Sequence, residues 1–223
     1  EPRRRQPART TLGITMGDPA GIGPEVIAKA LSGGRLHKIC RPLVIGALPI
    51  MAHTIKDLRL KLTVLPVDGH DTAVPRPGTV AVLDPLSTPL GRFAPGLAAA
   101  ETGAASVTFI EKAVELAQLG CLDGIVTAPI NKEAINMAGC RYPGHTELLA
   151  DLTHAKESGM MIVGGPLRIM FVTTHVAIKD LPMLLTQAKI GKAIRLAHMA
   201  LTTLFGIKRP KIGVAALNPH AGE

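Results

Sequence analysis

The sequence has 223 residues, 47% of them hydrophobic, and a formal net charge of +8, which is enough apolar material for one large or two small α/β units. No apolar run approaches the roughly 18 to 20 residues that span a bilayer, so a transmembrane segment is not expected. Aromatic residues make up 2% of the chain and the positive charges beyond the N-terminus are scattered, which argues against nucleic-acid binding; small anionic ligands explain the positive surplus equally well.

The N-terminal residues 1–10 are predicted to form a basic, disordered tail, because four of them are arginines. The segment that follows contains Asp18, Pro19 and several glycines, so it cannot serve as the apolar core of a signal peptide. The cysteines are odd in number and form no CxxC pair, which predicts reduced thiols and a cytoplasmic protein. These cysteines are Cys40, Cys121 and Cys140.

Short apolar runs that end at Gly, Pro or polar residues predict buried strands. In chain order the expected strands are Leu12–Met16, Leu43–Gly46, Leu62–Val67, Thr79–Leu83, Gly124–Thr127, Ile169–Thr174 and Ile212–Leu217. Apolar residues at helical spacing predict helices between them. The expected helices are Pro24–Leu31, Leu97–Leu119, Lys132–Met137 and Gln187–Phe205.

This alternation predicts an α/β fold with a largely parallel sheet covered by helices. The segment 163–167, Val-Gly-Gly-Pro-Leu, predicts a hairpin instead, so the second half of the chain is expected to contain a mixed sheet. Two α/β domains are predicted, at 11–137 and 138–223, the second of them incomplete at its C-terminal end.

The first segment with possible chemistry is MGDPAGIGPE, residues 16–25, between the first strand and the first helix. Backbone N–H groups and the positive end of the helix could face an anion there. The segment has neither the GxGxxG spacing nor the Lys of a P-loop. An ordinary Gly-rich turn explains it equally well.

Two further segments follow the fifth expected strand. Lys132, in TAPINKE, could point a charge into a cleft at the strand end, although a lysine in a first helical turn is more often simply solvated. His145 and Thr146, in YPGHTE, are predicted to open another helix, where an imidazole, a hydroxyl and free N–H groups suit a phosphate. Simple capping by Thr146 is the alternative.

Two histidines come at expected strand ends, His175 in TTH and His220 in NPH. Neutral imidazole is a good metal ligand, and two of them from neighbouring strand ends could share one ion. For each histidine alone, a structural role with a hydrogen bond is the more common one.

The segments MGDPAGIGPE, APINKEAIN, YPGHTELLA, TTHVAIKD and LNPHAGE resemble, in order and spacing, the 4-hydroxythreonine-4-phosphate dehydrogenases of pyridoxal phosphate biosynthesis. The patterns MGDPAGIGPE, NKEA and GHTELLA lean toward relatives that act on threonate or erythronate phosphates. The first segment also looks like an expanded form of the GDGIGPE run of isocitrate and isopropylmalate dehydrogenases.

The resemblance implies an isocitrate/isopropylmalate dehydrogenase-like α/β/α two-domain subunit, a homodimer and an active site in the interdomain cleft. It makes His145 and Thr146 substrate-binding residues and His175 and His220 ligands of a divalent metal (Zn, Mg, Co or Mn). Lys132 is a candidate catalytic residue.

The cofactor implied by the resemblance is NAD, bound without a Rossmann fingerprint. No residue of this sequence is assigned to NAD, because relatives continue past NPHAGE with further metal, substrate and NAD residues. The NAD-binding residues are therefore expected beyond Glu223, the last residue of the sequence. On the same resemblance, the sequence is expected to be a fragment or an incomplete subunit.

The implied reaction is NAD-linked oxidation of a phosphorylated hydroxy acid to a 3-oxo acid, which readily loses carbon dioxide. Two alternatives stay open: a cis-dihydrodiol carboxylate dehydrogenase of the same fold, and a non-catalytic module that binds a phosphorylated acid. Phosphoryl transfer is disfavoured by the missing P-loop Lys.

Overall fold

A computed structural model of the chain describes residues 9–68 and 76–220. These residues form two compact units, one extending to His154 and the other beginning at Ala155. Among the described helices, none is both long enough and apolar enough to cross a membrane.

The N-terminal unit is built on a sheet of five parallel strands in the order β3-β4-β2-β1-β5. The strands are β1 (Thr11–Thr15), β2 (Arg41–Ile45), β3 (Thr63–Pro66), β4 (Thr79–Leu83) and β5 (Gly124–Thr127). Strand β1 lies between β2 and β5, and Thr15 is paired with both Ile45 and Thr127. The predicted parallel α/β architecture is therefore confirmed for this unit.

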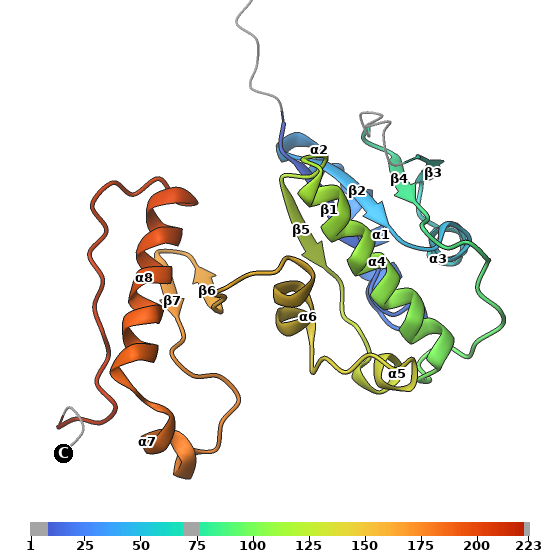
Figure 1. The fold of residues 1–223 in the computed structure, drawn as a ribbon. Helices are drawn as coiled ribbons and strands as arrows, with labels where there is room; N and C mark the ends of the chain where they lie inside the picture. Colours follow the sequence, from blue (N-terminus) through green and yellow to red (C-terminus); the bar gives the residue numbers. More distant parts are fainter. Residues whose placement is uncertain (1–8, 69–75, 221–223) are drawn as a thin grey trace, which may run out of the picture. The chain divides into compact units, whose positions relative to one another are not determined.

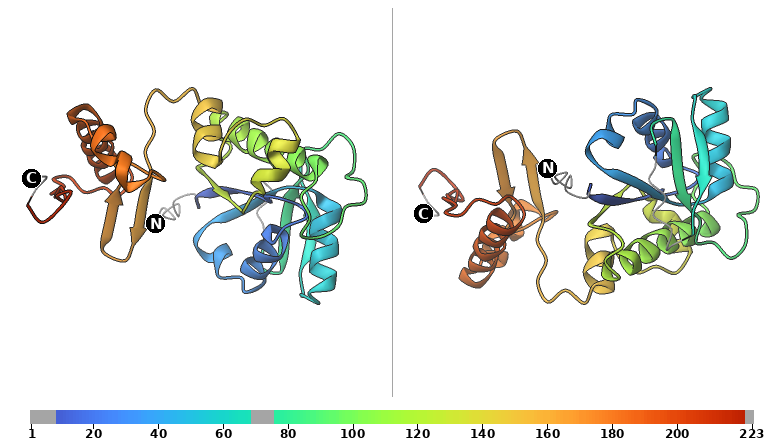
Figure 2. Two further views of the ribbon diagram at one scale, coloured as in Figure 1. Left: turned by 90° about the horizontal axis from the view of Figure 1, so that it is seen from below. Right: turned by 90° about the horizontal axis from the view of Figure 1, so that it is seen from above.

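Helices cover both faces of this sheet (Figures 1 and 2). The helices of this unit are α1 (Gly23–Ser32), α2 (Leu36–Ile39), α3 (Leu48–Asp57), α4 (Ala100–Gln118), α5 (Lys132–Met137) and α6 (His145–Leu152). Helices α1 and α3 pack together on one face, and α4 lies on the other against β1, β2 and β5. This three-layer arrangement follows from strands whose two faces are both apolar.

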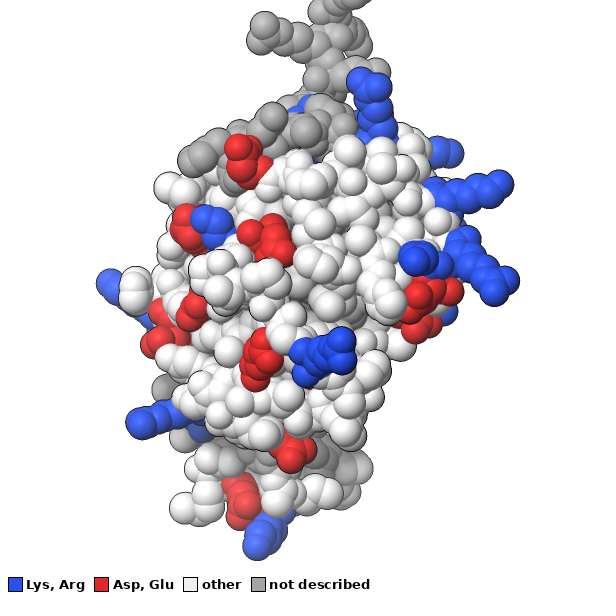
Figure 3. Space-filling view, turned by 90° about the vertical axis from the view of Figure 1, so that its right-hand side faces the viewer, with Lys and Arg blue, Asp and Glu red and all other residues white. Residues whose placement is uncertain are grey.

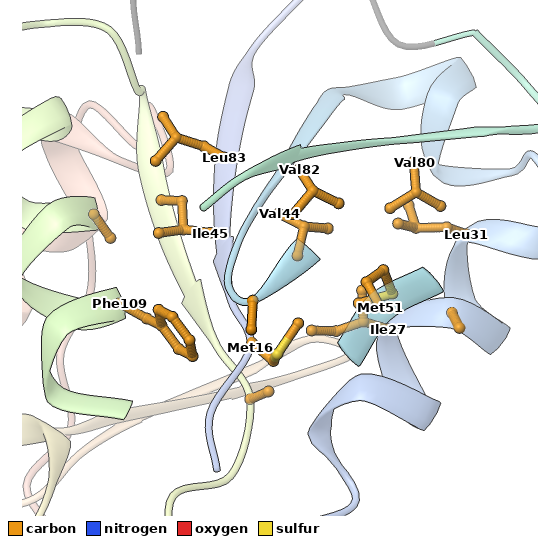
Figure 4. Packing of buried hydrophobic residues seen from close by; sticks show 14 of the residues in the cluster. Met16, Ile27, Leu31, Val44, Ile45, Met51, Val80, Val82, Leu83 and Phe109 are labelled. Atoms are coloured by element: carbon orange, nitrogen blue, oxygen red, sulfur yellow. The ribbon is translucent and has the colours of Figure 1, made fainter. Parts of the chain in front are cut away.

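The hydrophobic core joins both faces of the sheet. Met16, fully buried at the end of β1, has Phe109 of α4 to one side and Ile27 and Met51 of α1 and α3 to the other (Figure 4). A smaller cluster holds α6 in place, because Leu148 packs with Ile110 of α4 and its neighbours. The core therefore anchors the helices and strand ends that carry the first three sequence segments described above.

Helix α4 also packs closely against α5. Gly103 faces the carbonyl group of Ala134 so closely that a Cβ atom at residue 103 would collide with backbone. Ser106, one helical turn on, donates hydrogen bonds from its hydroxyl to Thr102 O (2.8 Å) and Gly17 O (3.2 Å). One helix thus positions both α5 and the loop after β1.

The C-terminal unit contains a two-stranded antiparallel sheet, β6 (Met161–Gly164) and β7 (Leu167–Met170), followed by η1 (Ile178–Asp180), α7 (Leu181–Leu184) and α8 (Gln187–Thr203). Helix α8 packs against β7, and the guanidinium of Arg168 lies 4.6 Å from the centre of the Phe205 ring. The hairpin predicted at 163–167 is confirmed.

Several sequence predictions are wrong in detail. The described strands form one parallel and one antiparallel sheet rather than a mixed sheet. The predicted strand at Ile212–Leu217 is irregular, and the strand predicted at Ile169–Thr174 instead ends at Met170. Residues 172–174 and 212–217 have no neighbouring strand to pair with among the described residues, and an apolar run forms a strand only when its backbone groups are paired.

The ends of the predicted segments also differ from the structure. Residues 1–8 of the predicted tail lie outside the described residues, but Arg9 donates a hydrogen bond to His37 O (2.7 Å) and Thr10 O accepts one from the Arg41 N–H (2.8 Å). The structure divides after His154, whereas the sequence placed a domain boundary after Met137, because α5 and α6 both pack on α4. Cys40, Cys121 and Cys140 are free in the structure, and their reduced state stays a prediction.

Candidate active site

Two loops at the carboxyl edge of the parallel sheet form a cleft of about 330 Å³. One loop follows β1 and the other follows β5, and these strands are neighbours. The cleft is lined by Asp18, Ala20, Gly21, Ile22, Gly96, Pro129, Ile130, Asn131 and Lys132. Open α/β sheets bind ligands at this edge, and the structure brings the first two predicted segments together there.

The loop after β1 is fixed by close backbone contacts. Gly17 adopts φ +71°, and a Cβ atom at this position would collide with Pro129 O. The Asp18 N–H donates to Pro129 O (3.0 Å), which ties this loop to the loop after β5. Only a residue without a side chain fits here, because the left-handed conformation and the close approach coincide.

Asp18 lines the cleft and is 3% exposed. One of its carboxylate oxygens, Oδ1, accepts a hydrogen bond from the Ala20 N–H (2.9 Å), and its carbonyl accepts one from the Gly21 N–H (2.9 Å). Sequence reasoning did not single out this residue. The Asp-Pro-Ala-Gly order, which is typical of a turn closed by an aspartate side chain, was the available signal.

Lys132 lies at the rim of the cleft as the first residue of α5. Asn131 caps this helix, since its side-chain oxygen accepts a hydrogen bond from the Ala134 N–H (3.1 Å). Lys132 is exposed, so its ammonium group can meet an anion in the cleft, whereas its predicted catalytic role stays a prediction.

His145 and Thr146 begin α6, as the sequence predicted. Gly144 precedes them with an extended backbone and offers no side-chain cap. Thr146 is exposed and lies within the first turn, so it is not the residue that caps the helix. Its hydroxyl belongs to a helical turn whose backbone N–H groups have no intrahelical partner.

The imidazole of His145 is half-buried, and its buried Nε2 atom has no hydrogen-bond partner in the structure. Burial lowers the pKa of His145 from its ordinary value of 6.5, because desolvation disfavours the imidazolium ion. His145 is therefore neutral at physiological pH, with one ring nitrogen able to donate and the other able to accept.

His175 and His220, the predicted metal ligands, both lie exposed in the C-terminal unit. His175 follows β7 in a left-handed conformation, φ +55°, and the His220 N–H donates to Asn218 Oδ1 (3.1 Å). In residues 9–68 and 76–220, no group of three or more His, Cys, Asp or Glu side chains is arranged to hold an ion. The metal site stays a prediction.

The NAD-binding residues were expected beyond Glu223. Glu223 itself lies outside the described residues, which end at His220, so this expectation is not tested by the structure and stays a prediction. Within the described residues, Lys132 contributes a positive charge to the lining of the cleft between the loops after β1 and β5.

Charged side chains are distributed over the face shown in Figure 3. Lys and Arg side chains alternate there with Asp and Glu, with several basic side chains along one edge. A second cleft of about 570 Å³ is lined by Val67, Asp68, Leu83, Asp84, Pro85, Thr108, Glu111, Lys112 and Glu115. Its acidic lining is unsuited to a phosphorylated acid.

The architecture is that of an open α/β protein with its candidate site at the carboxyl edge of a parallel sheet. The family model described as "Pyridoxal phosphate biosynthetic protein PdxA" matches residues 38–223. The chain belongs to the PdxA family, as its sequence segments predicted.

Curated relatives agree with this assignment. The chain is 42% identical over 215 residues to a 4-hydroxythreonine-4-phosphate dehydrogenase of Desulfosudis oleivorans, covering 96% of this chain and 63% of the relative. It is 38% identical over 216 residues to a D-threonate 4-phosphate dehydrogenase of Cupriavidus necator, covering 95% and 63%. The chain therefore spans less than two thirds of these relatives.

Solved structures show the same fold. A 4-hydroxythreonine-4-phosphate dehydrogenase from Burkholderia phymatum superposes with a TM-score of 0.86 at 39% identity, covering 96% of this chain and 64% of that one. A terephthalate 1,2-cis-dihydrodiol dehydrogenase from Burkholderia xenovorans gives a TM-score of 0.65 at 30% identity, covering 96% and 63%. Both identity and superposition are higher for the phosphate-ester enzyme.

Proposed function

We propose that this chain forms part of an enzyme that oxidises a phosphorylated four-carbon hydroxy acid with NAD and a divalent metal. The candidate substrates are 4-hydroxythreonine-4-phosphate and D-threonate 4-phosphate, after the names of the relatives. The observation that carries the proposal is the neutral, half-buried His145 beside Thr146 at the start of α6 in a PdxA-family chain.

His145 and Thr146 are assigned to the phosphate group of the substrate. A neutral imidazole donates one hydrogen bond, the Thr146 hydroxyl donates another, and the unpaired N–H groups of the first turn of α6 add more. The positive end of the helix favours an anion at the same place. These groups recognise phosphate without needing a charged side chain.

His175 and His220 are assigned to the metal. Both imidazoles are exposed, and imidazole nitrogen is a common ligand of Zn, so the two residues fit that ion in donor type. A bound divalent ion would act as a Lewis acid that lowers the pKa of the substrate hydroxyl. Two protein ligands leave coordination positions for the substrate and for other groups.

The cleft between the loops after β1 and β5 is assigned to an anionic part of NAD or of the substrate. Lys132 lines this cleft and supplies positive charge, and Gly21 and Ile22, which directly precede α1, line it as well. NAD supplies the hydride acceptor when bound. We assign Lys132 to attracting and orienting the anion, because its exposed ammonium is a hydrated point charge.

The remaining parts of the proposal follow from the product and from the family resemblance. Oxidation of the carbinol next to the carboxylate-bearing carbon gives a 3-oxo acid, which readily loses carbon dioxide, so decarboxylation is included. An isocitrate dehydrogenase-like subunit, homodimeric assembly and a cytoplasmic location are proposed with it.

The first test is NADH formation by purified protein with NAD and a divalent metal. Four substrates are compared: 4-hydroxythreonine-4-phosphate, D-threonate 4-phosphate, the erythronate analogue and a cis-dihydrodiol dicarboxylate. Turnover of a phosphate ester supports the proposal, and turnover of the dihydrodiol alone replaces it with the other activity of this fold. Ligand binding without NADH formation indicates a non-catalytic binding module.

The metal assignment is tested in the same assay. His175→Ala and His220→Ala should each abolish metal-dependent turnover and leave the circular dichroism spectrum unchanged, because both side chains are exposed. His198→Ala, which removes another exposed histidine of the same unit, is the matched control and should keep full activity. Activity that persists in both ligand variants, or in the presence of a chelator, rules out the assignment.

A further inference from the structure

Helix α6 has little of its own to hold its first residues in place. It comprises only His145–Leu152, and its N-cap residue, Gly144, forms no side-chain cap. Isolated helices of this length are marginal in water, so the orientation of His145 depends on contacts made by the surrounding chain.

The segment that leads into α6 is irregular between Cys140 and Gly144. Within it, the Tyr142 hydroxyl donates a hydrogen bond to Asp151 Oδ2 (2.5 Å). Tyr142 lies before the helix and Asp151 lies in its last turn, so the bond connects the entering segment to the far end of the same helix.

The ring of Tyr142 makes a second, independent contact. It packs against the cluster of Ile110, Val114 and Leu148, which joins α4 to α6. The far end of α6 is also tied to α4, because Gln118 Nε2 donates to Leu152 O (3.3 Å). The packed ring therefore holds the entering segment against α4 and α6. The hydrogen bond of the hydroxyl sets the position of the segment along α6.

His145 has no comparable anchor of its own. Its Nε2 atom is buried without a partner, so packing alone holds the imidazole in orientation. A shift of the entering segment is transmitted directly to His145 and Thr146, which begin the helix.

We infer that Tyr142 and Asp151 are positioning residues, which hold the start of α6 so that His145 and Thr146 meet a phosphorylated ligand in one orientation. The inference rests on the proposed function for its substrate. The effect of Tyr142 and Asp151 on His145 can be measured without any substrate.

The first experiment uses the fact that the chain contains one Tyr and no Trp. The absorbance of tyrosinate during an alkaline titration therefore reports Tyr142 alone in the 223-residue chain. The bond to Asp151 raises the pKa of Tyr142, and Asp151→Asn should lower it toward the ordinary value of 10.0. An unchanged titration means that the bond is not formed in solution, which overturns the inference.

The second experiment follows the His145 imidazole by NMR in the wild-type chain, Tyr142→Phe, Asp151→Asn and the double variant. Tyr142→Phe keeps the packed ring and removes only the hydroxyl. The pKa of His145, lowered by burial, should move up toward 6.5 equally in all three variants, because each breaks the same bond. His53, exposed on α3, is an internal reference whose resonances should coincide in all four proteins.

The third experiment measures kinetics with the phosphorylated substrate. Loss of one orienting bond should raise KM about three- to tenfold and leave kcat within about twofold, with no further loss in the double variant. Asp151→Glu, which keeps an acceptor, should recover part of the loss. Glu157→Gln, a carboxylate bonded to Arg195 in the C-terminal unit, is the control and should match wild type.

The outcomes separate this inference from the proposed function. Wild-type turnover with an unchanged KM in Tyr142→Phe overturns the inference and leaves the function intact. Absence of wild-type turnover overturns the function, while the titration of His145 still decides whether the pair positions it. Equal His145 titrations in wild type and all variants overturn the inference whatever the activity.

Discussion

Gly17 is the residue on which the shape of the candidate cleft depends most directly. Gly17→Ala adds a Cβ atom in a left-handed conformation and against Pro129 O and the Ala128 carbonyl. We expect the free energy of unfolding to fall by about 2–4 kcal/mol, of which about 1 comes from the conformation and the rest from the collision. Urea denaturation measures the change.

Gly120→Ala is the matched control for Gly17→Ala. Gly120 is also left-handed, φ +74°, but a Cβ atom there meets nothing within 4 Å. Gly120→Ala should therefore lower the free energy of unfolding by only about 1 kcal/mol. Equal losses at the two positions would mean that the contact between the two loops is not tight in solution.

The burial of His145 makes the free energy of unfolding depend on pH. Its pKa is lower in the folded chain than in the unfolded chain, so between these two values the unfolded state binds more protons. The stabilisation is fully present above the unfolded value and is lost as pH falls from about 6.5 to the lowered folded value. In His145→Gln, the loss of stability over this pH range should be smaller than in wild type.

Urea midpoints measured at several pH values test this prediction. All other residues are the same in both proteins, so their effect cancels in the difference between wild type and variant. If the difference in urea midpoint between wild type and variant stays constant from neutral pH to below the ordinary pKa of histidine, His145 is solvated in the folded chain.

At the scale of helices, the contact between α4 and α5 determines where the second loop of the cleft lies. Gly103→Ala places a Cβ atom against the Ala134 backbone, which cannot move without α5 and therefore without Asn131 and Lys132. We expect a loss of about 1–3 kcal/mol in the free energy of unfolding, measured by urea denaturation.

Replacing a glycine in another helix should instead raise the free energy of unfolding. Gly191 lies inside α8, where a Cβ atom would meet only the end of the Arg195 side chain at 3.6 Å. Gly191→Ala should therefore strengthen α8, by about 0.5–1 kcal/mol, because the helix loses a flexible residue. If Gly103→Ala and Gly191→Ala both raise the free energy of unfolding, α4 and α5 do not approach each other as closely as described.

The same scale shows what the sequence could and could not predict. Periodicity located α1, α4, α5 and α8 within a few residues. Helix α3 was missed although Leu48, Met51 and Ile55 have helical spacing, and the single turn of α2 is too short for any periodicity. The apolar run 212–217 was misread because strand formation depends on a pairing partner, which local sequence does not contain.

At the scale of the molecule, the sequence placed two segments at strand ends but did not predict the strand order. The segments GDPAGIG and APINK were each predicted at a strand end, but only the order β3-β4-β2-β1-β5 makes those strands neighbours. That order depends on long-range packing. The buried Asp18 and the contact of Gly96 with the cleft were missed for the same reason, since neither lies in a periodic element.

The two units differ in how much hydrophobic surface each buries. The N-terminal unit contains both hydrophobic clusters of the described chain. Among the described residues of the C-terminal unit, the buried hydrophobic residues are two alanines and one leucine. They are Ala193, Ala197 and Leu201. Several large apolar side chains of its hairpin, including Ile162 and Leu167, are exposed.

Residues 9–154 should consequently fold alone, whereas residues 155–220 alone should not, because so small a core cannot offset the conformational entropy of ordering the chain. Separate expression of the two segments tests this. The first should show a cooperative urea transition and protected amide hydrogens on β1, β2 and β4. The second should show neither. Protection of β6 and β7 in the isolated second segment would mean that the Arg168–Phe205 contact and the packing of α8 on β7 suffice to order it.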